Sequence, residues 1–241
     1  MNLVLDFGNT RLKAGVFEGD QLLHTHVFDS TKAFLKSELL QLPVQRCLIA
    51  SVTEAHSSVF DQLSPLFSTK LFSTSTPVPV TNLYTSALTL GSDRLAASVG
   101  AFSLYPHKNV LTIDAGTCIK YNFVNSDNEY LGGAISPGLS MRLKAMHHFT
   151  KALPLIEADH SYDKLIGQST AESLLSGALV AAACEVDGMM DRYKANYDDL
   201  IVVLTGGDAD YLGKQLKNRF FANQNLVLVG LNTILNYSVE K

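Results

Sequence analysis

The sequence has no tryptophan and only three cysteines among its 241 residues. These cysteines, Cys47, Cys118 and Cys184, are far apart, and no CxxC pair or zinc-type spacing occurs. An odd number of scattered cysteines argues against a disulfide framework and against a structural zinc site. Because 46% of the residues are hydrophobic, the chain can instead build a real core at this length.

The sequence also lacks a large excess of charge of one sign, because 19 basic and 23 acidic residues give a net charge of only -4. General nucleic-acid binding needs clustered Lys and Arg, so we expect no nucleic-acid partner. Long hydrophobic runs are absent too, and none approaches the roughly 20 residues of a membrane-spanning helix. The N-terminal residues lack the basic segment of a secretory signal. We therefore expect a cytoplasmic protein that does not bind membranes.

What the sequence does contain is a repeated order of elements: three strands, a helix, a strand and a helix occur twice. In the first copy we expect strands at 3–6, 13–17, 22–28 and 47–52 and helices at 31–42, 54–66 and 91–105. In the second copy we expect strands at 110–114, 119–124, 130–135, 201–205 and 226–229, with helices from 139, from 169 to about 193, after 207 and at the C-terminus. Such alternation predicts layered α/β domains.

The two copies also share residues. Leu3-Val4-Leu5-Asp6-Phe7-Gly8-Asn9-Thr10 parallels Leu111-Thr112-Ile113-Asp114-Ala115-Gly116-Thr117 at an offset of 108 residues. Short solenoid repeats have periods of about 20–50 residues, so this offset indicates a duplicated domain instead. The sequence therefore predicts two domains, residues 1–108 and residues 109–241.

The shared segment places Asp, Gly and a hydroxyl directly after a buried strand. Glycine allows the backbone N–H groups to approach a phosphate closely, and Asn9 and Thr10 can donate hydrogen bonds to it. Asp6 can hold Mg²⁺, and Lys13 adds a positive charge. The residues Asp-x-Gly-Asn are equally typical of a plain hairpin turn. The first segment alone therefore leaves open whether it is a phosphate site or only a turn. The second copy favours a nucleotide site, because two such turns can grip phosphates from both sides of a cleft.

Gly91-Ser92-Asp93-Arg94 begins a helix, and two interpretations of it are open. In the first, Ser92 caps the helix, Asp93 favours the helix dipole and Arg94 is solvated. In the second, Asp93 accepts a proton from a substrate hydroxyl while Arg94 binds a carboxylate. Taken alone, the segment favours the first interpretation.

Five motifs follow one another along the chain: Asp6-x-Gly-Asn-Thr-x-x-Lys13, Gly91-x-Asp-Arg94, Asp114-x-Gly-Thr117, Gly132-Gly133-x-Ile135-x-Pro137-Gly138 and Thr205-Gly206-Gly207-Asp208. In this order and spacing they resemble the type III pantothenate kinase family. The resemblance covers essentially the whole chain. It implies duplicated actin-like, or ribonuclease H-like, βββαβαβα domains with a nucleotide cleft between them. It also implies ATP-dependent phosphorylation of pantothenate to 4'-phosphopantothenate, the first step of coenzyme A biosynthesis.

The resemblance further implies a homodimer that needs Mg²⁺ and a monovalent cation, K⁺ or NH₄⁺. It makes Asp93 the catalytic base and Asp114 the ligand of the monovalent cation, with Mg²⁺ near Asp6. The implied ATP-binding residues are Asp6, Phe7, Gly8, Asn9, Thr10, Arg11, Leu12, Lys13 and Thr117. The implied substrate-binding residues are Tyr84, Gly91, Ser92, Asp93, Arg94 and Thr170, the last supplied by the other subunit.

Two departures from the family pattern affect these assignments. Ser169 stands where the family often has Asn before Thr170, and Ala87 stands in a region that commonly holds Pro after the pocket tyrosine. Two further functions also stay open. A non-catalytic relative in gene regulation would keep the phosphate turns, and a sugar kinase or polyphosphate-type phosphatase would share the fold. The presence of Asp93 argues against the first, and the Gly91–Arg94 motif argues against the second.

Overall fold

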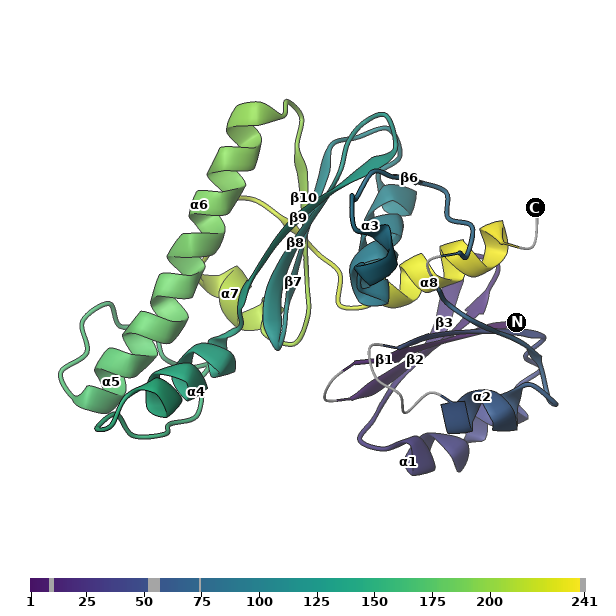
Figure 1. Ribbon diagram of the computed structural model, residues 1–241, viewed down its shortest axis with the longest axis horizontal. Coiled ribbons are helices and arrows are strands. Elements are labelled where there is room, and N and C mark those ends of the chain that lie inside the picture. The colour runs from purple at the N-terminus through teal and green to yellow at the C-terminus, as the bar shows by residue number, and fades with distance from the viewer. Residues whose placement is uncertain (9–10, 52–56, 74, 239–241) are drawn as a thin grey trace. The chain divides into compact units, whose positions relative to one another are not determined.

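The computed structural model describes residues 1–8, 11–51, 57–73 and 75–238. The chain forms two compact units (Figure 1). Unit 1 contains residues 1–107, 124–132 and 225–241, and unit 2 contains residues 108–123 and 133–224. The chain therefore passes from unit 1 to unit 2 near residue 108, where the duplication divides the sequence. The C-terminal segment, residues 225–241, belongs to unit 1.

The sheet of unit 1 has the strand order β3-β2-β1-β4-β5. Its strands are β1 (Asn2–Phe7), β2 (Leu12–Glu18), β3 (Gln21–Phe28), β4 (Arg46–Ser51) and β5 (Ser68–Leu71). The first three strands are antiparallel neighbours, whereas β1, β4 and β5 are parallel. This sheet is buried on both faces, since Val4 packs in one hydrophobic cluster while Leu3 and Leu5 pack in another. The unbroken apolar run of β1 follows from this double burial.

The sheet of unit 2 repeats this topology. Its strands are β7 (Val110–Ala115), β8 (Cys118–Val124), β9 (Glu129–Pro137), β10 (Ile201–Thr205) and β11 (Phe221–Ala222). Their order, β9-β8-β7-β10-β11, is the order of unit 1 with each strand replaced by its counterpart. The first residues of β9 lie in unit 1, where they pair with the short strand β6 (Thr81–Asn82). The internal duplication predicted from the sequence is thus present in the strand topology.

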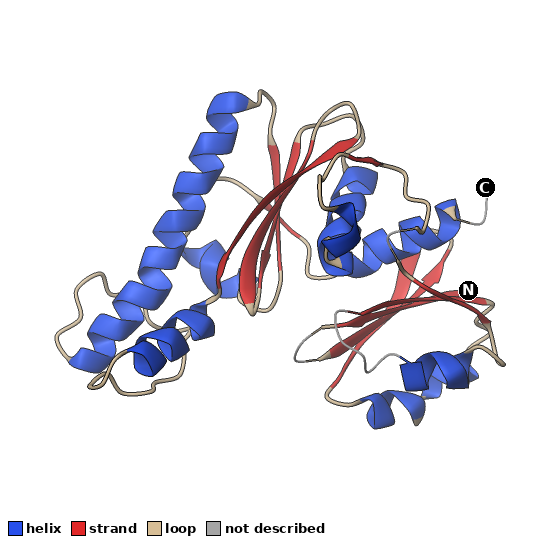
Figure 2. Cartoon of the chain, in the orientation of Figure 1, coloured by secondary structure: helices blue, strands red, loops and turns tan. Residues whose placement is uncertain are grey.

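Helices cover both sheets (Figure 2). In unit 1 they are α1 (Thr31–Leu35), α2 (Ser57–Leu63), α3 (Ser92–Leu104), α8 (Leu226–Tyr237) and the short turns η1 (Glu38–Gln41) and η3 (Ala87–Thr89). In unit 2 they are α4 (Leu139–Phe149), α5 (Thr170–Leu175), η4 (Ser176–Val180), α6 (Ala181–Asn196) and α7 (Ala209–Gln215). The helix expected at 31–42 is therefore broken into α1 and η1.

The C-terminal helix α8 corrects one expectation. Residues 226–229 are the first turn of α8 and not a strand, and the last strand is the two-residue β11. The apolar run of residues 226–229 fits a helix as well as a strand, because α8 is buried on most of its circumference, including Leu228, Leu231 and Ile234. Such a helix lacks the polar face that would distinguish it from a buried strand.

A buried asparagine network fixes α8 on the sheet of unit 1. The Asn2 side-chain amide donates to Asn232 Oδ1 and to Asn236 Oδ1, each at 2.8 Å. Arg46 Nε donates in turn to Asn2 Oδ1 at 3.0 Å, and Asn232 Nδ2 donates to the Gly19 carbonyl at 2.9 Å. Asn2 and Asn232 are each only 2% exposed, so these bonds satisfy groups that would otherwise be costly to bury. The N-terminal strand and the C-terminal helix are thereby held together.

The helical run Thr170–Asn196 has the length and hydropathy that a membrane-spanning helix needs. Core helices of soluble proteins meet the same criterion, and here Leu174, Leu179 and Met190 lie in the hydrophobic core of unit 2. The expectation that the protein does not bind membranes stays a prediction. The expected start of this run is confirmed, because the Ser169 side chain accepts a hydrogen bond from the Glu172 backbone N–H at 3.2 Å.

Candidate active site

The first expected phosphate segment connects β1 to β2 in unit 1. Gly8 N donates to the Arg11 carbonyl at 3.1 Å, which closes the turn. Asp6 lies at the end of β1 and is the Cα partner of Lys13 on β2. Phe7 and Leu12 are 4% exposed, so their side chains belong to the core and only their backbone is left for a ligand. Asn9 and Thr10, to which we assigned hydrogen bonds with phosphate, lie outside the described residues.

The second expected phosphate segment connects β7 to β8 in unit 2. Gly116 N donates to the Cys118 carbonyl at 3.0 Å, and Gly138 N donates to the Thr117 carbonyl at 3.2 Å. On the other side, Asp208 N donates to the Ala115 carbonyl at 2.9 Å. Two motifs that are distant in sequence thus hydrogen-bond to this one turn and hold it in place: Pro137-Gly138 and Gly206-Gly207-Asp208.

A lysine that the sequence analysis did not single out lies against Asp114. Lys120 Nζ on β8 is 2.7 Å from Asp114 Oδ2 on β7, with side-chain exposures of 19% and 16%. The only signal of this pair in the sequence was a lone charged residue within the apolar strand expected at 119–124. Among the described residues, no group of three or more His, Cys, Asp or Glu side chains could chelate a metal. The residues around Asp114 therefore do not fit an additional cation well, since its carboxylate already has a cationic partner.

An ionic clamp holds the segment that follows β9, and the sequence analysis did not find it either. Arg142 Nε donates to the Pro137 carbonyl at 2.9 Å, and Arg142 Nη2 lies 2.6 Å from Glu185 Oε2. Ser136 Oγ donates to the other Glu185 oxygen at 2.6 Å. Burial acts to raise the pKa of Glu185, but the hydrogen bonds from Ser136 and Arg142 outweigh it and hold the pKa below its usual value. The clamp thereby fixes the residue that precedes Gly138.

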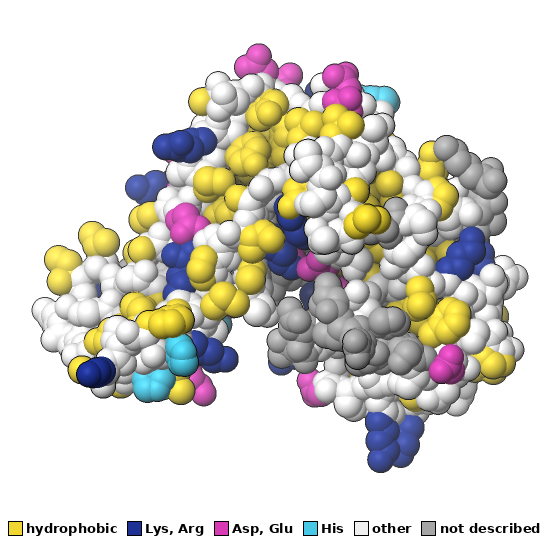
Figure 3. Space-filling view, viewed as in Figure 1, with side chains coloured by type: hydrophobic (Ala, Val, Ile, Leu, Met, Phe, Trp, Pro, Cys, Tyr) yellow, Lys and Arg dark blue, Asp and Glu magenta, His cyan; other side chains and the backbone are white. Residues whose placement is uncertain are grey.

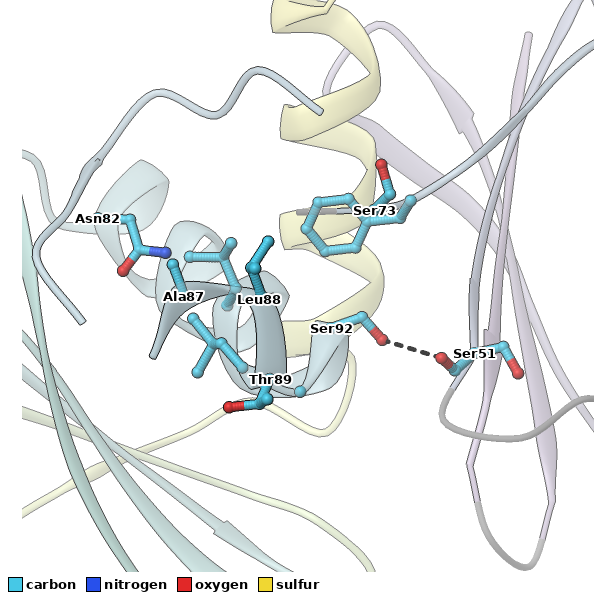
Figure 4. A pocket seen from close by; sticks show the side chains of 11 residues that line it. Ser51, Ser73, Asn82, Ala87, Leu88, Thr89 and Ser92 are labelled. Atoms are coloured by element: carbon cyan, nitrogen blue, oxygen red, sulfur yellow. Dashed lines mark hydrogen bonds between the residues drawn. The ribbon is translucent and has the colours of Figure 1, made fainter. Parts of the chain in front are cut away.

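The Gly91–Arg94 segment begins α3 in unit 1. The helix N-cap is Gly91, without a side-chain capping bond, so the expectation that Ser92 caps the helix was wrong. Ser92 Oγ instead donates to the Ser51 carbonyl at 3.4 Å (Figure 4). Asp93 Oδ1 accepts a hydrogen bond from the Arg94 backbone N–H at 2.8 Å. A Cβ on Gly91 would lie only 2.7 Å from that same oxygen, so a residue with a side chain at position 91 would displace this carboxylate.

Arg94 is buried, and this overturns the interpretation in which it is solvated. Only 6% of the residue is exposed, and its guanidinium carbon lies 5.4 Å from the centroid of the Tyr84 ring. A hydrogen bond from Arg94 and the charge of Arg94 lower the pKa of Tyr84, with a smaller contribution from Ser86. The Tyr84 ring also packs against Gly132, the first residue of the Gly132-Gly133 motif. Two of the family-like motifs, Gly91–Arg94 and Gly132-Gly133, therefore meet in unit 1 around Tyr84.

A pocket of about 360 Å³ lies beside this segment in unit 1 (Figure 4). Its polar lining comes from Ser51, Ser73, Asn82, Thr89 and Ser92, and its apolar lining from Phe72, Ala87, Leu88, Leu90 and Leu95, with Gly91 between them. None of these described residues carries a charge, so the pocket suits a neutral part of a ligand. Residues between Ser73 and Leu90, which precede α3, supply about half of this wall.

The remaining expected site residues lie in unit 2. Thr170 is the first residue of α5 and is exposed, next to the Ser169 cap. Asp114 and Thr117 flank the braced turn after β7. The site residues of the prediction thus divide into a group in unit 1, around Asp6 and Asp93, and a group in unit 2, around Asp114.

Two sheets of the same strand order, each with an Asp-x-Gly sequence at the end of its first strand, define the actin-like fold class. A ROK family glucokinase from Streptomyces griseus has a similar fold, with a TM-score of 0.55 at 12% identity over 100% of this chain and 99% of that one. A Baf family transcriptional activator from Campylobacter jejuni has a TM-score of 0.63 at 18% identity over 99% and 100% of the two chains. The predicted fold class is confirmed.

Within this class, the chain belongs to the type III pantothenate kinase family, whose family model matches residues 2–192. It is 40% identical to the type III pantothenate kinase of Flavobacterium johnsoniae, over 100% of this chain and 99% of that one. It is 42% identical to that of Christiangramia forsetii, over 99% of each. The family phosphorylates pantothenate in coenzyme A biosynthesis, so the predicted family, function and enzyme class are confirmed. The alternative of another enzyme of the same fold is excluded.

Proposed function

We propose that the chain transfers the terminal phosphoryl group of ATP to the primary hydroxyl of pantothenate, with Asp93 as the general base. The observation that carries this assignment is the fixed position of the Asp93 carboxylate. One of its oxygens is held by the Arg94 backbone N–H, and Gly91 leaves the space beside it open. A carboxylate held in this way can accept the hydroxyl proton as the new P–O bond forms.

ATP is bound by the segment from Asp6 to Lys13 and by Thr117. Backbone N–H groups of the two turns and the Lys13 ammonium offset the charge on the phosphate oxygens. Phosphoryl transfer depends mainly on such positioning and charge stabilisation. When bound, Mg²⁺ neutralises phosphate charge, with Asp6 as its protein ligand. Because no described cluster chelates a metal by itself, we propose that Mg²⁺ arrives with the nucleotide.

Pantothenate is bound by Tyr84, Gly91, Ser92 and Arg94, with Thr170 supplied by a second subunit. Pantothenate is an anion, and the buried Arg94 guanidinium places a positive charge in this region. The Tyr84 ring holds Arg94 through a cation–π contact, which restricts the guanidinium to one orientation. The uncharged pocket beside Ser92 accommodates a neutral part of the substrate.

A homodimer is part of this proposal, and the surface of unit 2 supports it. Figure 3 shows hydrophobic side chains gathered over the region of α4 and α5. The exposed apolar residues there are Met141, Phe149, Leu155, Leu165 and Ile166. Leu165 and Ile166 are more than 70% exposed and precede Thr170 by only a few residues. An apolar patch of this kind is typical of a surface that is covered by a partner.

We expect the protein to be a dimer and to act in the cytoplasm. Light scattering coupled to size-exclusion chromatography measures the mass of the particle and thus the number of chains in it. Changing Leu165 and Ile166 together to Ser should shift the protein toward the monomer, because the patch loses two of its three most exposed apolar side chains. Changing Leu88, an exposed leucine of unit 1, to Ser is the matched control and should leave the mass unchanged. A wild-type protein that elutes with the mass of one chain contradicts the dimer.

The reaction itself is tested by measuring ADP release from ATP in the presence of Mg²⁺, with and without pantothenate. We expect release that depends on pantothenate, and 4'-phosphopantothenate as the product. If the folded protein binds ATP but releases no ADP, the chain is a non-catalytic relative and its role lies with another partner.

A further inference from the structure

The ion pair between Lys120 and Asp114 occupies the position where the family resemblance implies a monovalent cation. The two atoms are 2.7 Å apart, and both side chains are more than four-fifths buried. A carboxylate of low exposure that is already in contact with an ammonium group is satisfied in charge. A second cation brought to the same oxygen would be repelled by the lysine.

A lysine side chain is chemically suited to this place. Its terminal group is an alkylammonium ion, which carries the same single positive charge as K⁺ or NH₄⁺ and donates hydrogen bonds as NH₄⁺ does. Unlike a free ion, it is tethered to β8, the strand that leaves the Gly116–Thr117 turn. Its position is therefore set by the fold and costs no binding entropy when the nucleotide arrives.

The first copy of the duplicated domain gives an internal parallel. There, Asp6 and Lys13 are Cα partners on the two strands that flank the first phosphate turn. In the second copy, Asp114 and Lys120 again lie on the two strands that flank the turn, and here their side chains form the ion pair. An aspartate with a lysine from the following strand is thus a feature of both halves.

We propose that the Lys120 ammonium supplies, at Asp114, the positive charge that a bound K⁺ or NH₄⁺ would otherwise supply. This inference rests on the proposed function, because it concerns the charge next to the phosphates of ATP. Its consequence is specific: the enzyme turns over without a monovalent cation. Removing the lysine charge should open the carboxylate to K⁺ and create a dependence that the wild-type protein lacks.

The test compares wild-type protein with K120M, K120R and K144M in potassium, sodium and choline chloride at equal ionic strength. K120M keeps the side-chain stem and removes the charge, whereas K120R keeps the charge. K144M is the matched control, because it removes one positive charge from an exposed position on α4. Three quantities are measured in each salt: the rate of ADP release, the Kd of ATP by calorimetry and the melting temperature.

For wild-type protein and K144M, we expect the same rate, Kd and melting temperature in all three salts. For K120M in choline, we expect ATP affinity to fall by about tenfold or more, because a charge-assisted contact is lost. Potassium should restore most of that affinity and raise the melting temperature of K120M. K120R should behave as the wild-type protein does with respect to potassium.

Two results would overturn the proposal. One is a wild-type protein that needs potassium for turnover or for tight ATP binding. The other is a folded K120M whose ATP affinity and melting temperature in choline equal those of the wild type. If no protein shows pantothenate-dependent turnover, the proposed function fails separately, because the ATP affinity and melting temperature still decide the role of Lys120. If K120M does not fold, the response of the wild type to potassium decides it.

Discussion

Replacing Asp93 by Asn should lower kcat for ADP release by about 10²–10⁴-fold, the contribution that a general base typically makes. The change removes a proton acceptor and almost nothing else. Asn has the same shape, and its side-chain oxygen can still accept the hydrogen bond from the Arg94 backbone N–H that Asp93 accepts now. The start of α3 and the position of Arg94 should therefore persist, and with them the contact between Arg94 and Tyr84.

The measurement is steady-state kinetics together with the Kd of ATP. We expect the Kd of ATP and the melting temperature of D93N to match those of the wild type. D127N, at an exposed turn position before β9, is the control for removing one carboxylate and should keep full activity. If D93N turns over at the wild-type rate, Asp93 is not the base and its role is confined to the helix start.

The duplication was visible in the sequence because it left both residue identities and element order in place. Strands buried on both faces, such as Leu3-Val4-Leu5, are continuous apolar runs, and their repetition predicted the two equivalent sheets. The C-terminal helix was not predictable in the same way. Leu226–Tyr237 is buried between other elements of unit 1, so its sequence shows no polar face, and the two-residue strand β11 shows no pattern at all.

The site was predictable in its motifs and much less so in its contacts. The sequence contains Gly91, Asp93 and Arg94 in order, yet nothing in it indicates that Arg94 is buried against Tyr84. Burial of a charge depends on a partner that lies in another segment, and a local pattern carries no information on such a partner. The same holds for Lys120. In the sequence it is one charged residue within an apolar strand, and only the fold shows that it pairs with Asp114.

Replacing Gly206 by Ala should destabilise the protein strongly and weaken ATP binding as well. Gly206 has a φ of +100°, which residues with a side chain rarely adopt. A Cβ at this position would lie 2.2 Å from the Ala115 carbonyl oxygen and 2.7 Å from the Ala115 nitrogen. The neighbouring backbone cannot easily move away, because Asp208 N is bound to that carbonyl and Thr205 pairs with Asp114 in the sheet.

Backbone strain of this kind and overpacking each cost about 1–3 kcal/mol, so we expect a loss of about 3 kcal/mol or more. For a chain of this length, that loss lowers the melting temperature by about 6–12 °C. ATP affinity should fall in parallel, because Ala115 leads directly into the Gly116–Thr117 turn that we assign to the phosphates. G207A is the matched control: no atom lies within 4 Å of its added Cβ, so its stability should change by less than about 0.5 kcal/mol. Equal melting temperatures for G206A and G207A would show that the Thr205-Gly206-Gly207-Asp208 segment does not brace the turn.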